Sequence, residues 1–144
     1  MTTSSEPALS LDLPCDTRAP GAVRAALSDV DWIDGAAAQV TLIASELVTN
    51  AVVHSGCRED HVLAVRAAVS RNRIMISVHD PGLSDEGARP RFGSEGTTGG
   101  WGLRIVDELS ARWGAQRQDG YRVWAEVPMP QLRRLPHEQA GDAA

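Results

Sequence analysis

Alternating apolar and polar positions predict strands at both ends of the chain and in its middle. In "ALSLDLP", Leu9, Leu11 and Leu13 alternate with polar residues, which is the period of a half-buried strand. "HVLAVRAAVS" and "RIMISVHD" are rich in Val and Ile, and the short link between them predicts a hairpin. A second hairpin is predicted at Asp119-Gly120, a strong two-residue turn signal.

Helical spacing of apolar residues predicts three helices. The first follows Thr17, a candidate cap, and has Pro20 in its first turn, where proline is tolerated. The longest follows Asp34, another candidate cap, and runs to about Ser55. The third, "WGLRIVDELSARWG", is expected to end near Gly114. The packed face of the long helix is predicted from residues spaced by four, three and four: Val40, Ala44, Leu47 and Ala51.

These elements predict a single domain with one sheet. Their order is strand, two helices, two strands, a long loop, a helix and two strands, and a sheet covered on one face by helices satisfies it. The chain has 144 residues, the length of one domain, which we place at residues 8–128. Residues 1–7 are expected to form a flexible leader and residues 129–144 a disordered tail.

Composition excludes several classes of function. The net charge is -5, which argues against sequence-independent binding to nucleic acid. All 14 basic residues are arginine, so the lysine of a Walker A loop and that of a Schiff-base enzyme are both absent. No signal peptide or membrane-spanning run is found, and we expect a cytoplasmic protein.

Cys15 and Cys57 are the only two cysteines. Neither lies in a CxxC pair or beside a histidine cluster, so the sequence predicts two ordinary reduced thiols.

A polar stripe marks the long helix. Glu46, Asn50 and His54 are spaced by four residues, about 400° of helix, and therefore project from nearly one line. A carboxylate can accept a proton from an attacking hydroxyl or water, and an amide oxygen can bind Mg²⁺. The alternative is a solvated helix face.

Two glycine-containing segments add candidate nucleotide contacts. Asp80 ends a predicted strand, where its carboxylate could accept a hydrogen bond from the exocyclic amine of adenine. Gly82 would let the backbone pass close to the base. The alternative is an ordinary Asp-Pro-Gly turn. In "GTTGGWGL", glycines precede a helix whose free N–H groups could bind phosphate. Such turns are also common without a ligand. The long loop between the two segments has little to bury, which is typical of a functional loop.

Three segments together resemble a known family. "ELVTNAVVHS", "VHDPG" and "GGWGLRIVDELSARWG" look like the N, G1 and G2 boxes of the GHKL ATPases, which include gyrase, histidine kinases and mismatch-repair ATPases. The short form with this spacing resembles the anti-sigma-factor serine kinases of bacteria over roughly residues 8–128. The resemblance implies an α+β, Bergerat-type fold: a two-layer α/β sandwich whose mixed, mainly antiparallel sheet is covered on one face by about three helices.

The resemblance also assigns roles to the candidate residues. Glu46 matches the general base, Asn50 the magnesium ligand, and Asp80 with Gly82 the adenine-binding pair. The segment from about residue 83 to residue 98 matches the ATP lid, whose arginines we interpret as solvated charges. The phosphate-binding start of the last helix matches Gly100, Gly102 and Leu103, and Trp101 between them is expected close to bound nucleotide.

The function implied is that of a kinase using ATP and Mg²⁺. Such a kinase transfers the γ-phosphate to a serine of an anti-anti-sigma partner and otherwise holds a sigma factor inactive. Homodimers are implied as well, whereas direct contacts with nucleic acid or a membrane are not. His54 has no assigned role, and we expect it to hydrogen-bond within the domain.

Two alternatives stay open. Ser84 and Thr98 stand where the wider family often has glycines, which favours a catalytically weak or inactive ATP-binding regulatory module acting by partner binding. The ATPase half of a histidine kinase is disfavoured, because no long helical hairpin is predicted to present a phosphoacceptor histidine.

Overall fold

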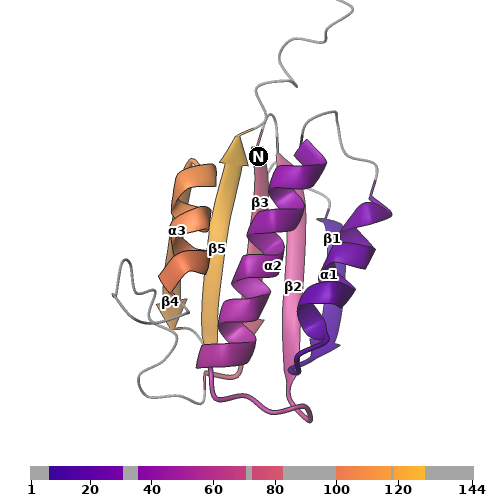
Figure 1. Ribbon diagram of the computed structural model, residues 1–144, viewed down its shortest axis with the longest axis vertical. Coiled ribbons are helices and arrows are strands. Elements are labelled where there is room, and N and C mark those ends of the chain that lie inside the picture. Colours follow the sequence, from indigo (N-terminus) through magenta and orange to yellow (C-terminus); the bar gives the residue numbers. More distant parts are fainter. Residues whose placement is uncertain (1–6, 31–35, 71–72, 83–99, 118, 129–144) are drawn as a thin grey trace, which may run out of the picture.

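The strands and helices follow one another in the predicted order. A computed structural model describes residues 7–30, 36–70, 73–82, 100–117 and 119–128 (Figure 1). The predicted tail, the cap at Asp34 and the lid lie outside these residues. The elements are β1 (Pro7–Pro14), α1 (Ala19–Ser28), α2 (Ala36–His54), β2 (Val62–Ser70), β3 (Arg73–Asp80), α3 (Gly100–Leu109), β4 (Arg112–Arg117) and β5 (Tyr121–Pro128).

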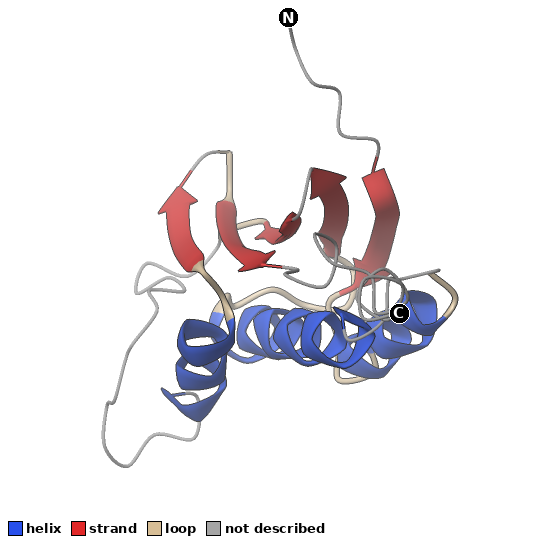
Figure 2. Ribbon diagram, turned by 90° about the horizontal axis from the view of Figure 1, so that it is seen from above, coloured by secondary structure: helices blue, strands red, loops and turns tan. Residues whose placement is uncertain are grey.

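The five described strands form one sheet in the order β1-β2-β3-β5-β4. Each neighbouring pair is antiparallel. The three described helices all lie on one face of this sheet, and none of the described helices covers the other face (Figure 2). The expected two-layer α+β fold is therefore confirmed.

The long helix α2 forms the centre of the core. Its predicted packed face is buried along its whole length, and α2 contacts β3, β5 and both other helices. The inward side chains of β3 are also buried, as the alternation in "RIMISVHD" predicts. Together these faces remove a continuous apolar surface from water, which is the main source of stability for a domain of this size.

The start of α1 differs from the prediction. Its N-cap residue is Arg18, with no side-chain cap, and Thr17 is exposed. Asp16 holds the turn instead, because its carboxylate accepts hydrogen bonds from the backbone N–H of Arg18 at 2.8 Å and from the Arg18 guanidinium at 2.9 Å. Pro20 lies in the first turn, as predicted.

The last helix also ends earlier than expected, at Leu109 instead of Gly114. The chain turns at once into the sheet, since the N–H of Ala111 already donates to the carbonyl of Glu126 at 2.7 Å. Gly114 belongs to β4 and lies against the Trp124 ring, where a Cβ would come within 2.9 Å of a ring carbon. Pairing of β4 with β5 and the contact of Gly114 with Trp124 therefore determine where α3 ends, although the spacing of apolar residues is helical up to Gly114.

The chain reverses direction at Asp119-Gly120, where a hairpin was predicted, but the connection is longer than the expected turn. It joins β4 to β5, and both residues have positive φ, 49° and 120°. The register pairs Arg117 with Tyr121, so three positions, 118–120, lie between the paired residues, and the expectation of a two-residue turn is wrong.

The expectation of two free thiols is wrong. Cys15 and Cys57 form a disulfide, with their Cα atoms 6.1 Å apart. Pairing of β1 with β2 places the end of β1 opposite the start of β2, and Pro14 faces Val62 there. The two cysteines flank this pair in space although 42 positions separate them in sequence, so no local motif could indicate the contact.

On the open face of the sheet, Glu126 of β5 binds Arg73 of β3 at 2.7 Å and Arg112 of β4. Glu126 is only 7% exposed, and its two ion pairs connect β5 with β3 and β4. The Arg112 guanidinium, followed by that of Arg73, lowers the pKa of the Glu126 carboxyl.

We expect Glu126→Gln to lower the free energy of unfolding at neutral pH by about 1 kcal/mol. A lowered pKa means that the stabilising charge is fully present above the unfolded-state pKa, about 4.3, and is lost as the pH falls through the folded-state value. The difference between variant and wild type should therefore shrink below about pH 4. Urea unfolding at a series of pH values measures it. Asp12→Asn, which breaks the more exposed pair with Arg66, is the control and should change stability less. A difference that does not vary with pH would contradict the assignment.

Candidate functional site

Three segments that carry the candidate residues meet at one end of the molecule. The Gln39 side chain, near the start of α2, donates to the carbonyl of Leu109 at the end of α3, at 2.6 Å. The two helices are therefore antiparallel, and the start of α3 lies toward the last turns of α2. Figure 1 shows these two helix ends beside the end of β3.

Asn50 is the most unusual polar residue of α2. It is 8% exposed, which rules out a solvated helix face at this position. Its side-chain nitrogen is buried and has no hydrogen-bond partner among the described residues. A buried amide group without a partner costs about 1–3 kcal/mol, so such groups are rare unless a ligand completes them.

Glu46 lies one turn before Asn50 on the same side of α2 and is half-buried. Its carboxylate makes no hydrogen bond with the described part of the chain. A half-buried carboxylate with free acceptor positions can take up a proton, as a general base must.

His54, the third member of the stripe, is different. It is exposed at the end of α2, and the described residues offer it no hydrogen bond. The expected bond within the domain is thus not found in this part of the chain, and the buried portion of the stripe ends at Asn50.

Asp80 ends β3 and is 2% exposed. The backbone N–H of Gly82 donates to its Oδ1 at 2.6 Å, as in the Asp-Pro-Gly turn considered above. Burial raises the pKa of the Asp80 carboxyl; the bond from Gly82 opposes this most strongly, with smaller effects of His79 and Arg117. A turn alone does not require a buried carboxylate, so Asp80 is more than a turn residue.

Two glycines in backbone contact hold Asp80 in place. Gly82 has a φ of 68°, and a Cβ on it would lie 2.8 Å from the carbonyl carbon of Gly120. A Cβ on Gly120 would lie 2.3 Å from the carbonyl oxygen of Asp80. The turn after β3 and the β4–β5 hairpin therefore interlock, and only glycine fits at either position.

Two further residues belong to this end of the site and were not predicted. Arg117 of β4 donates to the carbonyl of Gly82 at 3.4 Å and lies over the ring of Tyr121, 5.7 Å from its centre. Tyr121 is opposite Asp80 in the β3–β5 register. The sequence identified Gly120 as a hairpin residue, but nothing local to it indicates the contact with Asp80.

The helix α3 begins at Gly100, so the backbone of Gly100, Trp101, Gly102 and Leu103 forms its first turn. The first N–H groups of a helix have no partner within the helix and carry the positive end of its dipole. This is the backbone arrangement that a phosphate cradle needs. Ser84, Thr98 and both lid arginines, Arg89 and Arg91, lie outside the described residues.

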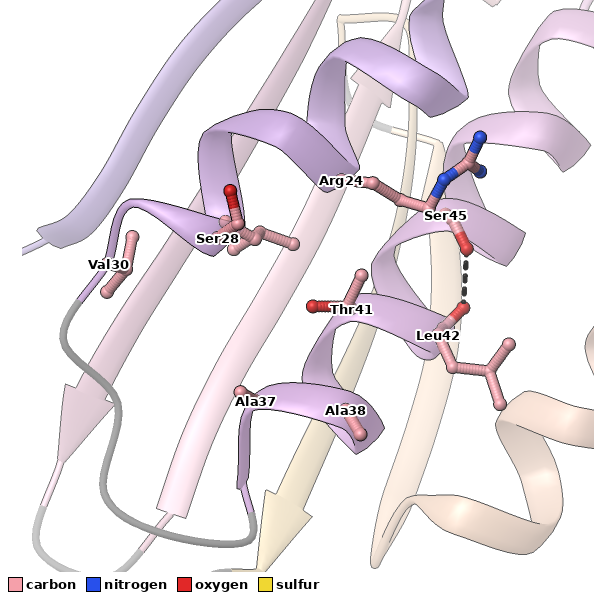
Figure 3. A pocket seen from close by; sticks show the side chains of 9 residues that line it. Arg24, Ser28, Val30, Ala37, Ala38, Thr41, Leu42 and Ser45 are labelled. Carbon is pink, nitrogen blue, oxygen red and sulfur yellow. Dashed lines mark hydrogen bonds between the residues drawn. The ribbon is translucent and has the colours of Figure 1, made fainter.

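A pocket of about 390 Å³ lies elsewhere, between α1 and the first half of α2 (Figure 3). Thr41, Leu42 and Arg24 are among its lining residues, and none of the predicted site residues borders it. It is therefore separate from the candidate site.

Comparison with known proteins identifies the fold independently. The profile of the histidine kinase-like ATPase domain matches residues 17–126. The histidine kinase domain from Erythrobacter litoralis EL346 blue-light activated histidine kinase is similar, with 23% identity and a TM-score of 0.54, over 84% of this chain and 62% of that one. A second structure, of the Erythrobacter litoralis EL346 blue-light activated histidine kinase, gives 24% identity and a TM-score of 0.56, over 85% of this chain and 44% of that one.

This chain thus spans less than two thirds of either structure. A search of curated protein sequences finds no match. Among the described residues, the helices are too short or too polar to cross a membrane.

We expect Gly82→Ala to lower the free energy of unfolding by about 2 kcal/mol, because it adds a side chain at positive φ and against the Gly120 backbone. Urea unfolding measures the change, and amide chemical shifts should move around Asp80 and Gly120. Gly21→Ala is the matched control. A Cβ on Gly21 would meet only the Arg24 side chain, at 3.6 Å, so this variant should be neutral or slightly more stable. Equal effects of the two substitutions would contradict the interlock.

Proposed function

The chain belongs to the histidine kinase-like ATPase domain family, and from that premise we propose that it is an anti-sigma-factor serine kinase. In this role it binds ATP, sequesters a sigma factor and phosphorylates an anti-anti-sigma partner on serine. The observation that carries the proposal is the buried side-chain nitrogen of Asn50, which has no partner among the described residues and lies one turn from Glu46, at the end of α2 that faces the start of α3.

Three parts of the chain would recognise the nucleotide: the Asp80 carboxylate, the backbone at Gly82 and the first turn of α3. The Asp80 carboxylate would accept a hydrogen bond from the exocyclic amine of adenine, because Gly82 and Gly120 fix the position of this carboxylate. The Gly82 backbone would lie beside the base, held there by its contact with Gly120. The N–H groups in the first turn of α3, from Gly100 to Leu103, would bind phosphate oxygens, with Trp101 close to the nucleotide.

Asn50 fits the role of a magnesium ligand. Its side-chain nitrogen is buried and has no partner within the described part of the chain, and its amide offers an oxygen of the kind Mg²⁺ prefers. The positions of the O and N atoms can be exchanged by rotation of the amide. The described residues hold no group of three or more His, Cys, Asp or Glu side chains suited to a metal. Magnesium usually keeps several waters and shares substrate phosphates, and when bound it neutralises their charge.

Glu46 would act as the general base. It would take the proton of the partner's serine hydroxyl while the serine oxygen forms a bond to the terminal phosphorus of ATP. The bond from that phosphorus to the bridging oxygen then breaks, and ADP leaves. Glu46 is suited to this because its carboxylate is half-buried and makes no hydrogen bond with the described residues.

The partners and the setting are proposals too. We propose a cytoplasmic homodimer that acts in transcription regulation through protein partners and not by contacting nucleic acid or a membrane. The net charge of -5 supports the absence of nucleic-acid contacts.

A second candidate is a catalytically weak or inactive ATP-binding module that changes its partner surface when nucleotide binds. Ser84 and Thr98, at positions where the family often has glycine, favour it. The two candidates differ in whether the Glu46 carboxylate is needed.

We expect Glu46→Gln to lower the rate of phosphate transfer by at least about 100-fold while ATP affinity changes less than about three-fold, because a base acts on the proton and not on nucleotide binding. Transfer of labelled phosphate to a cognate anti-anti-sigma protein and calorimetric ATP binding measure the two quantities.

Glu108→Gln on α3, an exposed glutamate, is the matched control and should behave as wild type. Undiminished transfer by Glu46→Gln would reject the base assignment. A wild-type protein that binds ATP and transfers no phosphate to its cognate partner would favour the regulatory module.

We expect ATP affinity to fall as the pH drops, with a midpoint above 3.8, because burial raises the pKa of Asp80 and protonation removes the acceptor for adenine. Asp80→Asn should weaken binding by about ten- to one-hundred-fold at neutral pH and lose this part of the pH dependence. Calorimetry across a pH series tests both, with Asp12→Asn as the control. The same pH dependence in Asp80→Asn and wild type would show that another group titrates.

A further inference from the structure

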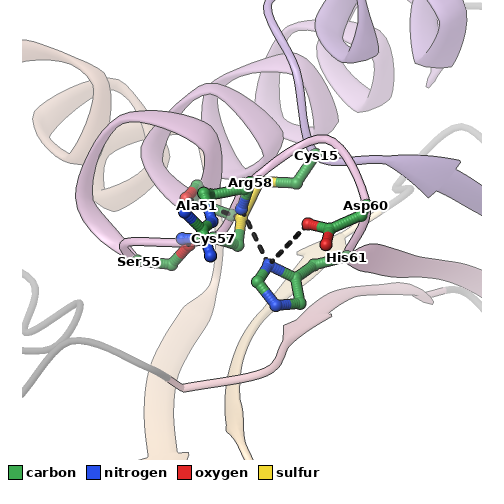
Figure 4. A network of polar contacts seen from close by, with 7 residues as sticks. All are labelled: Cys15, Ala51, Ser55, Cys57, Arg58, Asp60 and His61. Atoms are coloured by element: carbon green, nitrogen blue, oxygen red, sulfur yellow. Dashed lines mark hydrogen bonds and ion pairs between the residues drawn. A yellow bond between two sulfur atoms is a disulfide. The ribbon is translucent and has the colours of Figure 1, made fainter.

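The two cysteines join parts of the chain that flank the proposed site. Cys15 follows β1 and precedes α1, and Cys57 follows α2 by three residues. Figure 4 shows their disulfide beside Ala51 and Ser55 of the α2 end and beside the turn at residues 58–61. We name Cys15, Cys57 and this turn the cysteine corner.

On one side, the cysteine corner is attached to the last turn of α2. The backbone N–H of Cys57 donates to the Ser55 hydroxyl at 3.0 Å, and the Cys57 sulfur lies 3.8 Å from the carbonyl of Ala51. The N–H of Ser55 donates to that same carbonyl at 3.1 Å. Ala51 directly follows Asn50, so the disulfide is anchored within one residue of the proposed magnesium ligand.

On the other side, the corner is attached to the sheet. The N–H of Cys15 donates to the carbonyl of His61 at 3.1 Å, one residue before β2 begins. The turn itself is closed by two bonds of 2.8 Å between Arg58 and His61, one of them from the Arg58 N–H to Nδ1 of the imidazole. The end of α2 is thus tied to β1 and β2 by one covalent bond and a few hydrogen bonds.

We propose that Cys15 and Cys57 form a redox-modification site that sets nucleotide affinity. In the oxidised form the disulfide holds the last turn of α2, and with it Asn50, against the sheet. In the reduced form that turn frays more readily, because helix ends have unpaired carbonyls and open more easily than helix interiors. The effect on nucleotide rests on the proposed function, whereas the effect on α2 does not.

The chemistry is exchange with a small dithiol. Cys15 is 4% exposed and Cys57 is less buried, so a thiolate of the dithiol attacks the Cys57 sulfur and Cys15 leaves as a thiolate, which takes a proton. The second thiol of the dithiol then displaces Cys57 and closes a cyclic disulfide. Two electrons pass to the protein, which gains two thiols, and the dithiol is oxidised. In the cytoplasm, where we propose that this protein acts, disulfides are usually transient and take part in redox chemistry, and they are rarely permanent structural bonds.

Linkage requires the effect to be reciprocal. If reduction weakens nucleotide binding by some factor, nucleotide must make the disulfide harder to reduce by the same factor. Two independent measurements therefore have to agree.

The test compares oxidised and dithiothreitol-reduced full-length protein. We expect Mg-ATP to bind the reduced form about ten-fold more weakly, and hydrogen exchange to speed up at residues 50–57. The equilibrium of exchange with reduced and oxidised dithiothreitol, followed by thiol alkylation and mass, should shift by the same ten-fold when Mg-ATP saturates the protein. The control is the double variant Cys15→Ser, Cys57→Ser. It should bind Mg-ATP as weakly as the reduced protein does, and dithiothreitol should not change this affinity. If this variant does not fold, the reduced wild type supplies the comparison.

Equal ATP affinity in both forms would overturn the redox proposal and leave the proposed kinase intact. Two free thiols at equilibrium with oxidised dithiothreitol would overturn it as well. If no form binds ATP, the proposed function fails, and the redox effect is then judged by hydrogen exchange at residues 50–57. Unchanged exchange in that case would overturn the redox proposal too.

Discussion

The packing of α2 on the antiparallel sheet is the constraint from which the rest of the structure follows. Its apolar face is buried against β3 and β5, so the rotation of the helix about its own axis is fixed. Once that rotation is set, a residue about a quarter-turn from the packed face lies at the boundary of the core. Asn50 occupies such a position and is buried, whereas His54 at the helix end is exposed. The residues of the polar stripe therefore differ in burial. The apolar packing of α2 determines which of them can contact a ligand in a site shielded from water.

Two contacts then bring the other segments to this helix. The bond from Gln39 to Leu109 orients α3 antiparallel to α2, which directs the free N–H groups of its first turn toward the end that carries Asn50. The contact between Gly82 and Gly120 locks the end of β3 to the β4–β5 hairpin and so fixes the buried Asp80. Neither constraint uses a candidate ligand-binding side chain. The scaffold can therefore hold the site in position while the polar groups of the site keep their binding capacity.

The sequence patterns predicted the strands, the order of the elements and the packed face of α2, because each depends on local periodicity. They also identified the buried Asn50 and Asp80, whose residue types are unusual for such positions. They did not predict the disulfide, the end of α3 or the contact of Gly120 with Asp80. Each of these depends on strand pairing between residues distant in sequence: β1 with β2 for the cysteines, β4 with β5 for Gly114, and β3 with β5 for Gly120. The Thr17 cap failed for a more local reason: the Asp16 carboxylate accepts from the Arg18 N–H, and the Asp16 carbonyl accepts from the Ala19 N–H, the group that a Thr17 cap would need.

The buried polar groups of the site carry a cost that the surrounding fold must offset. The Asn50 side-chain nitrogen, which has no partner among the residues that the structure describes, and the buried Asp80 carboxylate each disfavour the folded state, the first by about 1–3 kcal/mol. A domain with only a few kcal/mol of net stability tolerates this when the elements around the site are held independently of the ligand. The Cys15–Cys57 disulfide does so for the end of α2, and the interlocked glycines do so for the end of β3. The cost at Asn50 would be recovered when a ligand supplies the missing partner, so binding and local order at the end of α2 should stabilise each other.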